Sequence, residues 1–249
     1  MQPEAFVPRW VVPPNVRALQ TTRLGGVSCG PWASLNLGDH VGDDPGAVAA
    51  NRAAVRSLLP AEPAWLRQVH GTVAVDAGQG SKMHEADAAW TRQPDCVCVV
   101  MTADCLPVLF CDRSGSVVAA AHAGWRGLLA GVLESTVVAM GVAPGELLAW
   151  LGPAIGPRRF EVGDEVRTAF VARDAEADNC FRPGGASGKW LCDLPSLARR
   201  RLAACGVADV TGSDECTVDD PERYFSFRRD GTTGRMATMI WLDVPAAGV

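Results

Sequence analysis

The strongest constraint on the fold is a series of three apolar segments of strand length between residues 96 and 122. They are CVCVVMTA (96–103), LPVLFCD (106–112) and SVVAAAH (116–122), and the turn-rich spacer RSGS (113–116) joins the last two. Short apolar runs bounded by glycine and serine are typical of buried β-strands, and a short polar spacer between two of them predicts a hairpin. We therefore expect a sheet in which residues 96–103 form a central strand beside this hairpin.

Helices and further strands alternate with this sheet along the chain. Asp44 followed by Pro45 is a good helix start, so the run that ends before Pro60 is predicted to be helical. A second helix is predicted over 127–140, with Gly141 just past its end. Short strands are predicted over 64–70 and 72–77, a long structured loop over 21–45, a helix from Asp193 to Gly206, and a last strand over 236–244.

This mixture of elements predicts an α/β (α+β) fold, in the form of a single-domain layered α/β sandwich around a mixed sheet. Hydrophobic residues make up 48% of the 249 residues, which is enough for one sizeable core. We expect residues 1–249 to form one domain, with the proline-rich residues 1–19 as a lead-in segment.

The composition argues against several classes of protein. A formal net charge of −5 and a pI near 5.4 give no simple electrostatic reason to bind nucleic acid or an anionic membrane, although a local basic groove stays open. The start of the chain lacks a signal-peptide pattern, and no apolar run reaches membrane-spanning length. Nine irregularly spaced cysteines do not indicate a disulfide framework. We expect a cytoplasmic protein, monomer or homodimer, with a small-molecule partner.

Two rare chemical groups fall at matched positions of the predicted hairpin. If the hairpin closes symmetrically about Ser114 and Gly115, His122 lies opposite Pro107. Cys105 is two residues from Pro107 and so on the same face, which makes it a diagonal neighbour of His122, roughly 7–8 Å away at the backbone. That distance suits metal bridging or proton transfer, and a one-residue bulge would remove it.

His70 is the third member of this candidate cluster. It is followed at once by a glycine in RQVHG, and His122 has a glycine two residues later. Two imidazoles and one thiolate make up the protein ligands of a catalytic zinc site whose fourth position is open, and copper could also enter such a site. The competing interpretation is that Cys105, His70 and His122 are separate structural residues. The spacing gives both equal weight, because no compact C-x-x-C or H-x-x-x-H signature is present.

Charged residues near these segments supply further candidates. Arg126 follows the His122 segment and Arg52 lies on the first predicted helix; either could clamp phosphate, because a guanidinium presents a fork of donors. Arg52 could equally belong to a solvated helix face. Asp104, beside Cys105, could orient a ligand, act as a base, or merely end a strand. The basic loop FSFRRDGTTGR matches neither the P-loop nor the dinucleotide fingerprint, so no ATP or NAD site is predicted.

Eight motifs in order carry a resemblance to a known family. They are TTRLGGVS, SLNLGDHVGDDP, NR, RQVHG, TADCLPVLF, HAGWRG, GPAIGPRRFEVG and FSFRRDGTTGRMAT. From about residue 20 to the last strand, the chain resembles the laccase-domain proteins, once called multicopper polyphenol oxidoreductases and now usually described as purine nucleoside phosphorylases. The resemblance implies that His70, Cys105 and His122 bind zinc.

The resemblance also implies an activity and a fold. It implies phosphorolysis of adenosine, inosine, guanosine and methylthioadenosine, together with adenosine deaminase activity, on a catalytic domain related to toxin-type cysteine hydrolases. The substrates would be a purine nucleoside and phosphate. The candidate catalytic residues are His70, Arg52, Asp104, Cys105 and His122, and the candidate substrate-binding residues are Asn36, Arg126 and Phe227. Phe227 departs from the family pattern, which often has Tyr there.

Other activities stay open. Cys105 as nucleophile and His122 as base would give an amidase or hydrolase, and some family members are linked to hydrolysis of cell-wall precursors. A copper-dependent polyphenol oxidase of the multicopper kind needs about ten ligating histidines. The chain has four, which excludes a conventional laccase but not oxidation at a single copper. The deaminase signature H-x-E with P-C-x-x-C is absent, so deamination would need another scaffold.

Overall fold

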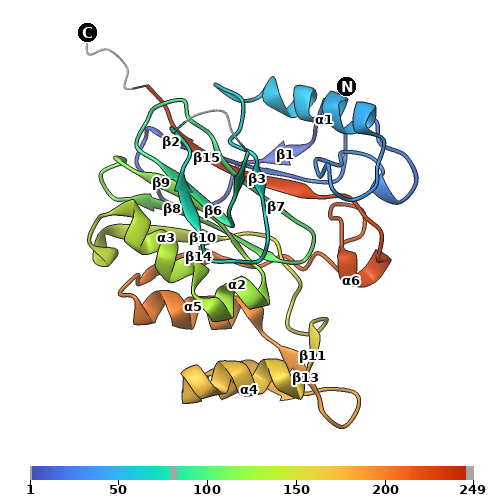
Figure 1. Cartoon of the computed structure of the whole chain (residues 1–249), viewed down its shortest axis with the longest axis vertical. Helices are drawn as coiled ribbons and strands as arrows, with labels where there is room; N and C mark the ends of the chain where they lie inside the picture. The colour runs from blue at the N-terminus through green and yellow to red at the C-terminus, as the bar shows by residue number, and fades with distance from the viewer. Residues whose placement is uncertain (1, 80–82, 245–249) are drawn as a thin grey trace.

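Two β-sheets stacked face to face form the centre of the molecule, and helices lie on their outer sides (Figure 1). The computed structural model describes residues 2–79 and 83–244. One sheet has the strand order β14-β10-β8-β9-β6-β4, formed by Asp209–Gly212, Leu147–Leu151, Leu106–Asp112, Val118–Ala123, Ala88–Thr91 and Ala74–Asp76. The other has the order β1-β2-β15-β7, formed by Ala5–Phe6, Val16–Thr21, Met236–Leu242 and Cys98–Thr102. Parallel and antiparallel pairs both occur, so the predicted mixed sheet and α/β class are confirmed.

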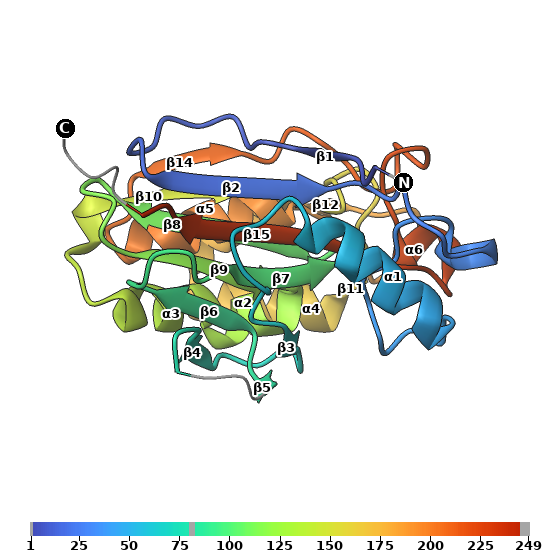
Figure 2. The same cartoon turned by 90° about the horizontal axis from the view of Figure 1, so that it is seen from above.

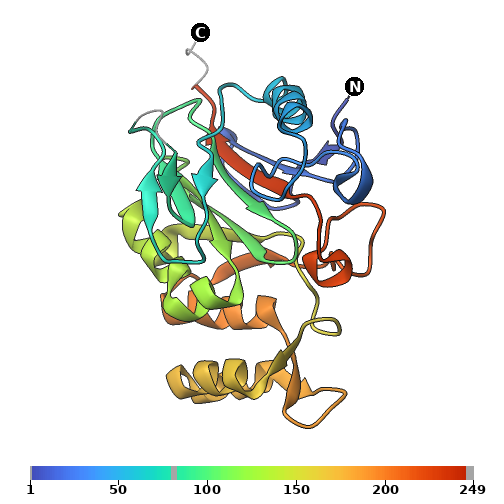
Figure 3. The ribbon, with the colours of Figure 1, turned by 45° about the vertical axis from the view of Figure 1, so that its right-hand side comes forward.

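The remaining elements cover or extend these two sheets (Figure 2, Figure 3). The α-helices are α1 (Pro45–Arg56), α2 (Trp125–Ala130), α3 (Val132–Met140), α4 (Asp164–Arg173), α5 (Leu194–Ala204) and α6 (Phe227–Asp230). The 3₁₀ helices are η1 (Gly30–Trp32), η2 (Pro144–Glu146) and η3 (Ala175–Cys180). Two small sheets are formed by β3 (Leu66–Arg67) with β5 (His84–Glu85), and by β11 (Glu161–Gly163), β13 (Lys189–Cys192) and β12 (Phe181–Pro183).

The hairpin of β8 and β9 has the predicted register. Pro107 pairs with His122 and Leu106 with Ala123, so no bulge intervenes before the strand ends. Alternate residues of β8 face different layers: Val108 belongs to the core beneath the helices, whereas Leu109 belongs to the core between the sheets. Both faces of the sheet are covered, so both alternating sets of side chains are buried. The strand is therefore continuously apolar.

Among the described residues, buried apolar side chains form four clusters, and the three largest hold the sandwich together. The first joins the six-stranded sheet to α3 and α5 and continues into the unit of α4 and β11–β13, which projects at one end of the molecule (Figure 3). The second fills the space between the two sheets. The third packs α1 and the preceding loop onto the outer face of the four-stranded sheet, through residues such as Val55, Leu37 and Met239. No helix within residues 2–79 and 83–244 is long and apolar enough to span a membrane.

Three expectations from the sequence need correction. Strand β7 stands at the end of its sheet's strand order rather than at its centre; it is continuously apolar because the inter-sheet core and the α1 layer cover its two faces. The helix predicted over 127–140 is two helices, because Gly131 takes φ +115° between them. The proline-rich start is more than a lead-in, since β1 and β2 are part of the four-stranded sheet. The predicted caps Asp44, Asp193 and Gly141 are confirmed.

Asp112 fixes the turn of the hairpin and makes stability depend on pH. Burial opposes its ionisation, but hydrogen bonds from Ser114, Ser116 and the Val117 N–H outweigh this and lower the pKa of Asp112 below its ordinary 3.8. A lowered pKa stabilises the fold at pH values above 3.8, and the stabilisation is lost as the pH falls below that value.

Replacement of Asp112 by asparagine is therefore expected to lower the free energy of unfolding at pH 7 by about 1–3 kcal/mol, because one of the two oxygens that accept from Ser114, Ser116 and the Val117 N–H becomes a donor. The difference from the wild type should shrink as the pH falls below 3.8, since the wild-type carboxyl is then protonated as well. Urea denaturation at pH 7 and pH 3 measures both values. A difference that stays constant between the two pH values would contradict this account.

Candidate metal centre

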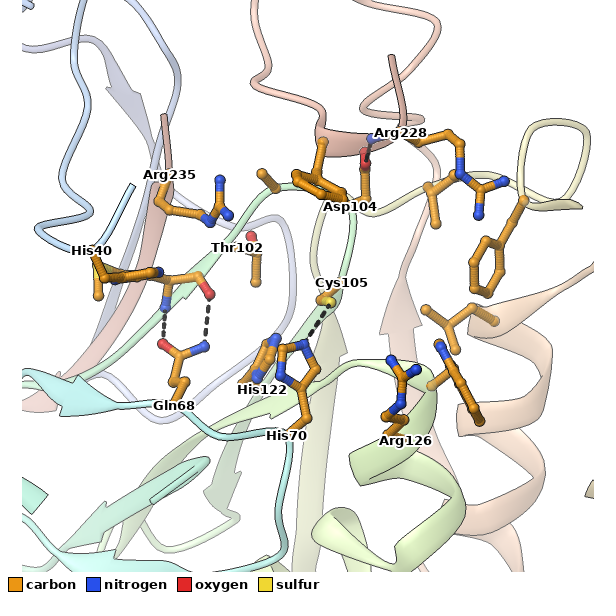
Figure 4. Close-up of a pocket in the computed structure, with 17 residues that line it drawn as sticks. His40, Gln68, His70, Thr102, Asp104, Cys105, His122, Arg126, Arg228 and Arg235 are labelled. Atoms are coloured by element: carbon orange, nitrogen blue, oxygen red, sulfur yellow. Dashed lines mark hydrogen bonds between the residues drawn. The ribbon is translucent and has the colours of Figure 1, made fainter. Parts of the chain in front are cut away.

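His70, Cys105 and His122 come together at one cavity (Figure 4). Their ligand atoms all lie within 4.8 Å of one another, and Cys105 Sγ is 3.9 Å from His70 Nε2. His70 follows β3, Cys105 directly precedes β8, and His122 lies in β9, so the hairpin brings two of the three residues together. The predicted juxtaposition of all three is present in the structure.

A buried carboxylate that the sequence did not single out orients this cluster. Asp87 is 0% exposed and accepts a hydrogen bond of 2.8 Å from Nδ1 of His122, which leaves Nε2 free for another partner. It also accepts the backbone N–H groups of Val69, His70 and Gly71 at 2.7–3.1 Å. A histidine ligand whose other nitrogen is held by a carboxylate is a recurrent arrangement at metal sites.

The same carboxylate holds the backbone that presents His70. His70 has φ +60°, in the left-handed region, which costs a non-glycine residue on the order of 1–3 kcal/mol. The three N–H groups collected by Asp87 belong to this turn and compensate for the strain. Asp87 thus orients both histidines, the ring of His122 directly and His70 through its backbone.

The electrostatics of the cluster favour a thiolate. Burial opposes ionisation of the Cys105 thiol, but the charge of His122 and the hydrogen bonds from both histidines outweigh it and lower the pKa of Cys105 to about 6. Burial likewise disfavours the charged form of His122, but the charge of Cys105 and the hydrogen bond to Asp87 raise the pKa of His122 to about 9. A thiolate is the form of cysteine that binds metal or attacks an electrophile.

Gly124 leaves the space that lets Cys105 and His70 converge as metal ligands. A Cβ built on Gly124 would lie 2.9 Å from Cys105 Sγ and 3.0 Å from the His70 ring. Gly124 has φ −61° and ψ 156°, which any residue can adopt, so the cluster rather than the backbone requires glycine there. Two nitrogens and one sulfur that converge in this way are the donor set of a three-ligand zinc site.

A Gly124→Ala variant is expected to bind zinc at least about 10-fold more weakly, because the added methyl displaces Cys105 or His70 from the ligand positions. The matched control is Gly145→Ala, since nothing lies within 4 Å of a Cβ built there. Competition with a chromogenic chelator measures both affinities. Equal zinc affinity in the two variants would contradict this account.

The cluster opens into a cavity of about 480 Å³, which is within the range of small-molecule sites. Three arginines line it, Arg126, Arg228 and Arg235, of which only Arg126 was predicted. Within residues 2–79 and 83–244, none of the three forms an ion pair with a carboxylate, whereas Arg52 pairs with Asp39. Other lining residues are His40, Gln68, Thr102, Trp125, Phe160 and Phe227, and the predicted substrate residue Phe227 is 59% exposed. The cavity thus combines free positive charge with aromatic surface.

Two predicted residues lie outside the lining of this cavity. Arg52 donates to the Leu37 carbonyl, pairs with Asp39 and stacks on Trp65 at 4.2 Å, so its guanidinium is occupied by the protein itself. Asn36 is 0% exposed, and its amide bonds to Gly38, Asp43 and the N–H of Arg235. The sequence predicted Arg52 as a catalytic residue and Asn36 as a substrate-binding residue, but it could not show that their polar atoms bond to the protein itself.

Asp104 lines the cavity, but its carboxylate is also occupied. It accepts hydrogen bonds from Thr217 Oγ1 at 2.6 Å, Ser226 Oγ at 3.1 Å and the Arg228 N–H at 2.6 Å. With φ +92°, Asp104 is held in a conformation that few non-glycine residues adopt. Its contacts indicate a residue that ties the start of α6 to the end of β7, rather than a free base.

The sequence and the fold of the chain are similar to those of known proteins. The sequence pattern of the multi-copper polyphenol oxidoreductase laccases matches residues 17–243. The chain belongs to this family. The family relationship confirms the resemblance drawn from the eight motifs, and it covers every residue of the metal cluster and of its carboxylate support.

Relatives in the laccase family extend over nearly the whole chain. The chain is 56% identical over 238 residues to a purine nucleoside phosphorylase of Pseudomonas aeruginosa, with 96% of this chain and 98% of the relative covered. It is 54% identical over 240 residues to the purine nucleoside phosphorylase YfiH of Escherichia coli, with 95% and 98% covered. A crystal structure of the protein NMB0706 of Neisseria meningitidis matches with a TM-score of 0.93 and 52% identity, over 96% of this chain and 99% of that one.

Proposed function

We propose that this chain is a zinc-dependent purine nucleoside phosphorylase acting on adenosine, inosine, guanosine and methylthioadenosine, with adenosine deamination as a secondary activity. The observation that carries the proposal is the His70–Cys105–His122 cluster at a cavity that also presents three arginines without ion-pair partners in the described ranges. The names of the relatives from P. aeruginosa and E. coli support the same activity.

The residues of the cavity suit the reactants of phosphorolysis. Hydrogen phosphate attacks C1′ of the ribose, the bond from C1′ to the purine nitrogen breaks, and the proton of the phosphate ends on the departing base. A cationic wall would hold the phosphate dianion, and the aromatic side chains Trp125, Phe160 and Phe227 would cover the purine and exclude water. Zinc, held by His70, Cys105 and His122, supplies a Lewis acid when it is bound.

The roles predicted for individual residues change with this geometry. Arg126 stays a candidate for substrate binding, since it lines the cavity and stacks on Trp125 at 4.4 Å. Arg52, Asn36 and Asp104 become positioning residues, because their polar atoms bond to the protein. The chemistry is thus assigned to the cluster and to the arginines that face it.

A second candidate function rests on a specific observation. Cys105, His122 and Asp87 follow the order of nucleophile, base and orienting carboxylate, and the pKa of Cys105 is about 6. Without a metal, this arrangement would support a Cys–His hydrolase of amides such as cell-wall precursors. Copper in the same three-ligand site would supply single-copper oxidation, and four histidines are too few for a multicopper centre.

Product analysis separates these functions. Purified protein of measured metal content is incubated with adenosine, inosine and methylthioadenosine, with and without phosphate. Phosphate-dependent release of free base supports phosphorolysis, and inosine with ammonia from adenosine supports deamination. If zinc-loaded protein yields neither product, the nucleoside assignment is wrong. In that case, alkylation of Cys105 in metal-free protein together with amide hydrolysis would support the hydrolase.

A further inference from the structure

One side of the cavity carries a buried hydroxyl, that of Thr102. Thr102, the last residue of β7, is 2% exposed and lines the cavity, and its Oγ1 has no hydrogen-bond partner among the described residues. Leaving a buried hydroxyl unpaired is unfavourable, so such a group at a binding cavity indicates a polar ligand.

Arg235 and Thr102 line the same cavity and lie at the same end of the pairing of β15 with β7. Met236, the neighbour of Arg235, is the direct cross-strand partner of Thr102 in this pairing. Figure 4 shows Arg235 extending toward Thr102, on the His40 and Gln68 side of Cys105, while Arg126 and Arg228 lie on the other side. The described contacts of its guanidinium are Nη1 donations to the Thr233 and Gly234 carbonyls, which leaves its other N–H groups available.

The loop before α1 packs around Arg235. Asn36 Oδ1 accepts the Arg235 N–H at 2.9 Å, and the Leu37 N–H donates to the Arg235 carbonyl at 3.1 Å. A Cβ on Gly38 would lie only 2.8 Å from Cγ of Arg235, so glycine there makes room for the arginine stem. These contacts fix the direction of the side chain before any ligand binds.

The three arginines of the cavity differ in how suited they are to an anion. Arg126 and Arg228 are exposed, and Arg228 Nη1 already donates to the Glu161 carbonyl. Arg235 is half-buried and lines the same cavity as the Thr102 hydroxyl, which has no partner in the described part of the chain. A desolvated guanidinium with a second donor beside it binds phosphate more strongly than an exposed one, because charge-assisted hydrogen bonds gain strength away from water.

We propose that Arg235 and Thr102 form the subsite that binds inorganic phosphate, with the purine on the opposite side of the metal centre. This inference rests on the proposed phosphorylase function. It assigns attack on C1′ to a phosphate held by Nη2 or Nε of Arg235 and by Oγ1 of Thr102. The purine then leaves toward Arg126 and the aromatic residues, taking the proton of hydrogen phosphate.

The test compares Arg235→Gln and Thr102→Val with Arg126→Gln, the matched arginine on the other side. Each zinc-loaded protein is assayed for the KM of phosphate and of inosine. Arg235→Gln is expected to raise the phosphate KM by at least about 10-fold and Thr102→Val by about 3- to 10-fold, with the inosine KM changed less than about 2-fold. Thr102→Val keeps the shape of the side chain and removes a hydroxyl that bonds to none of the described residues, so it tests the subsite even if Arg235→Gln does not fold.

Direct binding separates failure of this subsite from failure of the phosphorylase function. Equilibrium dialysis with radiolabelled inorganic phosphate is carried out without nucleoside. Phosphate binding that is lost in Arg235→Gln and kept in Arg126→Gln supports the subsite, even if no base is ever released. Phosphorolysis with an unchanged phosphate KM in Arg235→Gln and Thr102→Val overturns it while leaving the function intact. Arg235-dependent binding of adenosine 5′-monophosphate with no binding of inorganic phosphate also overturns it.

Discussion

Cys105→Ala is expected to lose bound zinc and phosphorolysis together, with kcat/KM reduced by at least about 10³-fold. Cys105 is the single sulfur of the cluster, and its pKa of about 6 makes it an anionic ligand at neutral pH. Its removal leaves two histidines, one ligand fewer than zinc takes from a protein in a catalytic site. Metal content by atomic emission and base release with phosphate measure the two effects.

The control for this experiment is Cys29→Ala. Cys29 is exposed and is not part of the cavity lining, so zinc content and activity should equal those of the wild type. Cys105→Ala protein that keeps a full equivalent of zinc but loses all activity would contradict the ligand assignment. That result would favour Cys105 as the nucleophile of the hydrolase alternative.

The parts of the site that depend on local sequence were predictable. The turn at Ser114 and Gly115 determines the register of the hairpin, and the register determines that Cys105 and His122 share a face. Gly124, two residues after His122, lies against Cys105 and the His70 ring, so this glycine belongs to the same local pattern. Such local patterns predict the structure well because the turn of a hairpin fixes which residues of its two strands pair.

The parts that depend on contacts between distant segments were not predictable. Asp87 lies in EADAAW with no spacing that links it to His70 or His122, and only the pairing of β6 with β9 brings it to them. Arg52 was an equally good phosphate candidate by type, but its helix turns it toward Asp39 and Trp65. The sequence did not indicate Arg235, because the direction of its side chain depends on Asn36 and Gly38, about 200 positions earlier in the chain.

Asp87→Asn should have the second largest effect, and it acts through the ligands rather than at the metal. Asp87 accepts four hydrogen bonds, two on each oxygen, so an amide nitrogen in place of either oxygen leaves two donors without an acceptor. We expect a loss of about 2–4 kcal/mol in the free energy of unfolding of the metal-free protein. Zinc affinity should fall by about 10- to 100-fold, because His122 loses its orientation and the turn at His70 loses its support.

Asp112→Asn is the control that makes this prediction specific. Asp112 is also buried, also accepts several hydrogen bonds from one turn, and supports the opposite end of the same hairpin. Both variants should be destabilised in urea, but only Asp87→Asn should bind zinc more weakly in a chelator competition. If the two variants lose zinc affinity equally, general loosening of the hairpin explains the effect, and Asp87 has no separate role in placing the histidines. If Asp87→Asn alone loses affinity, the carboxylate acts on the metal centre through His70 and His122, which is the role its four hydrogen bonds indicate.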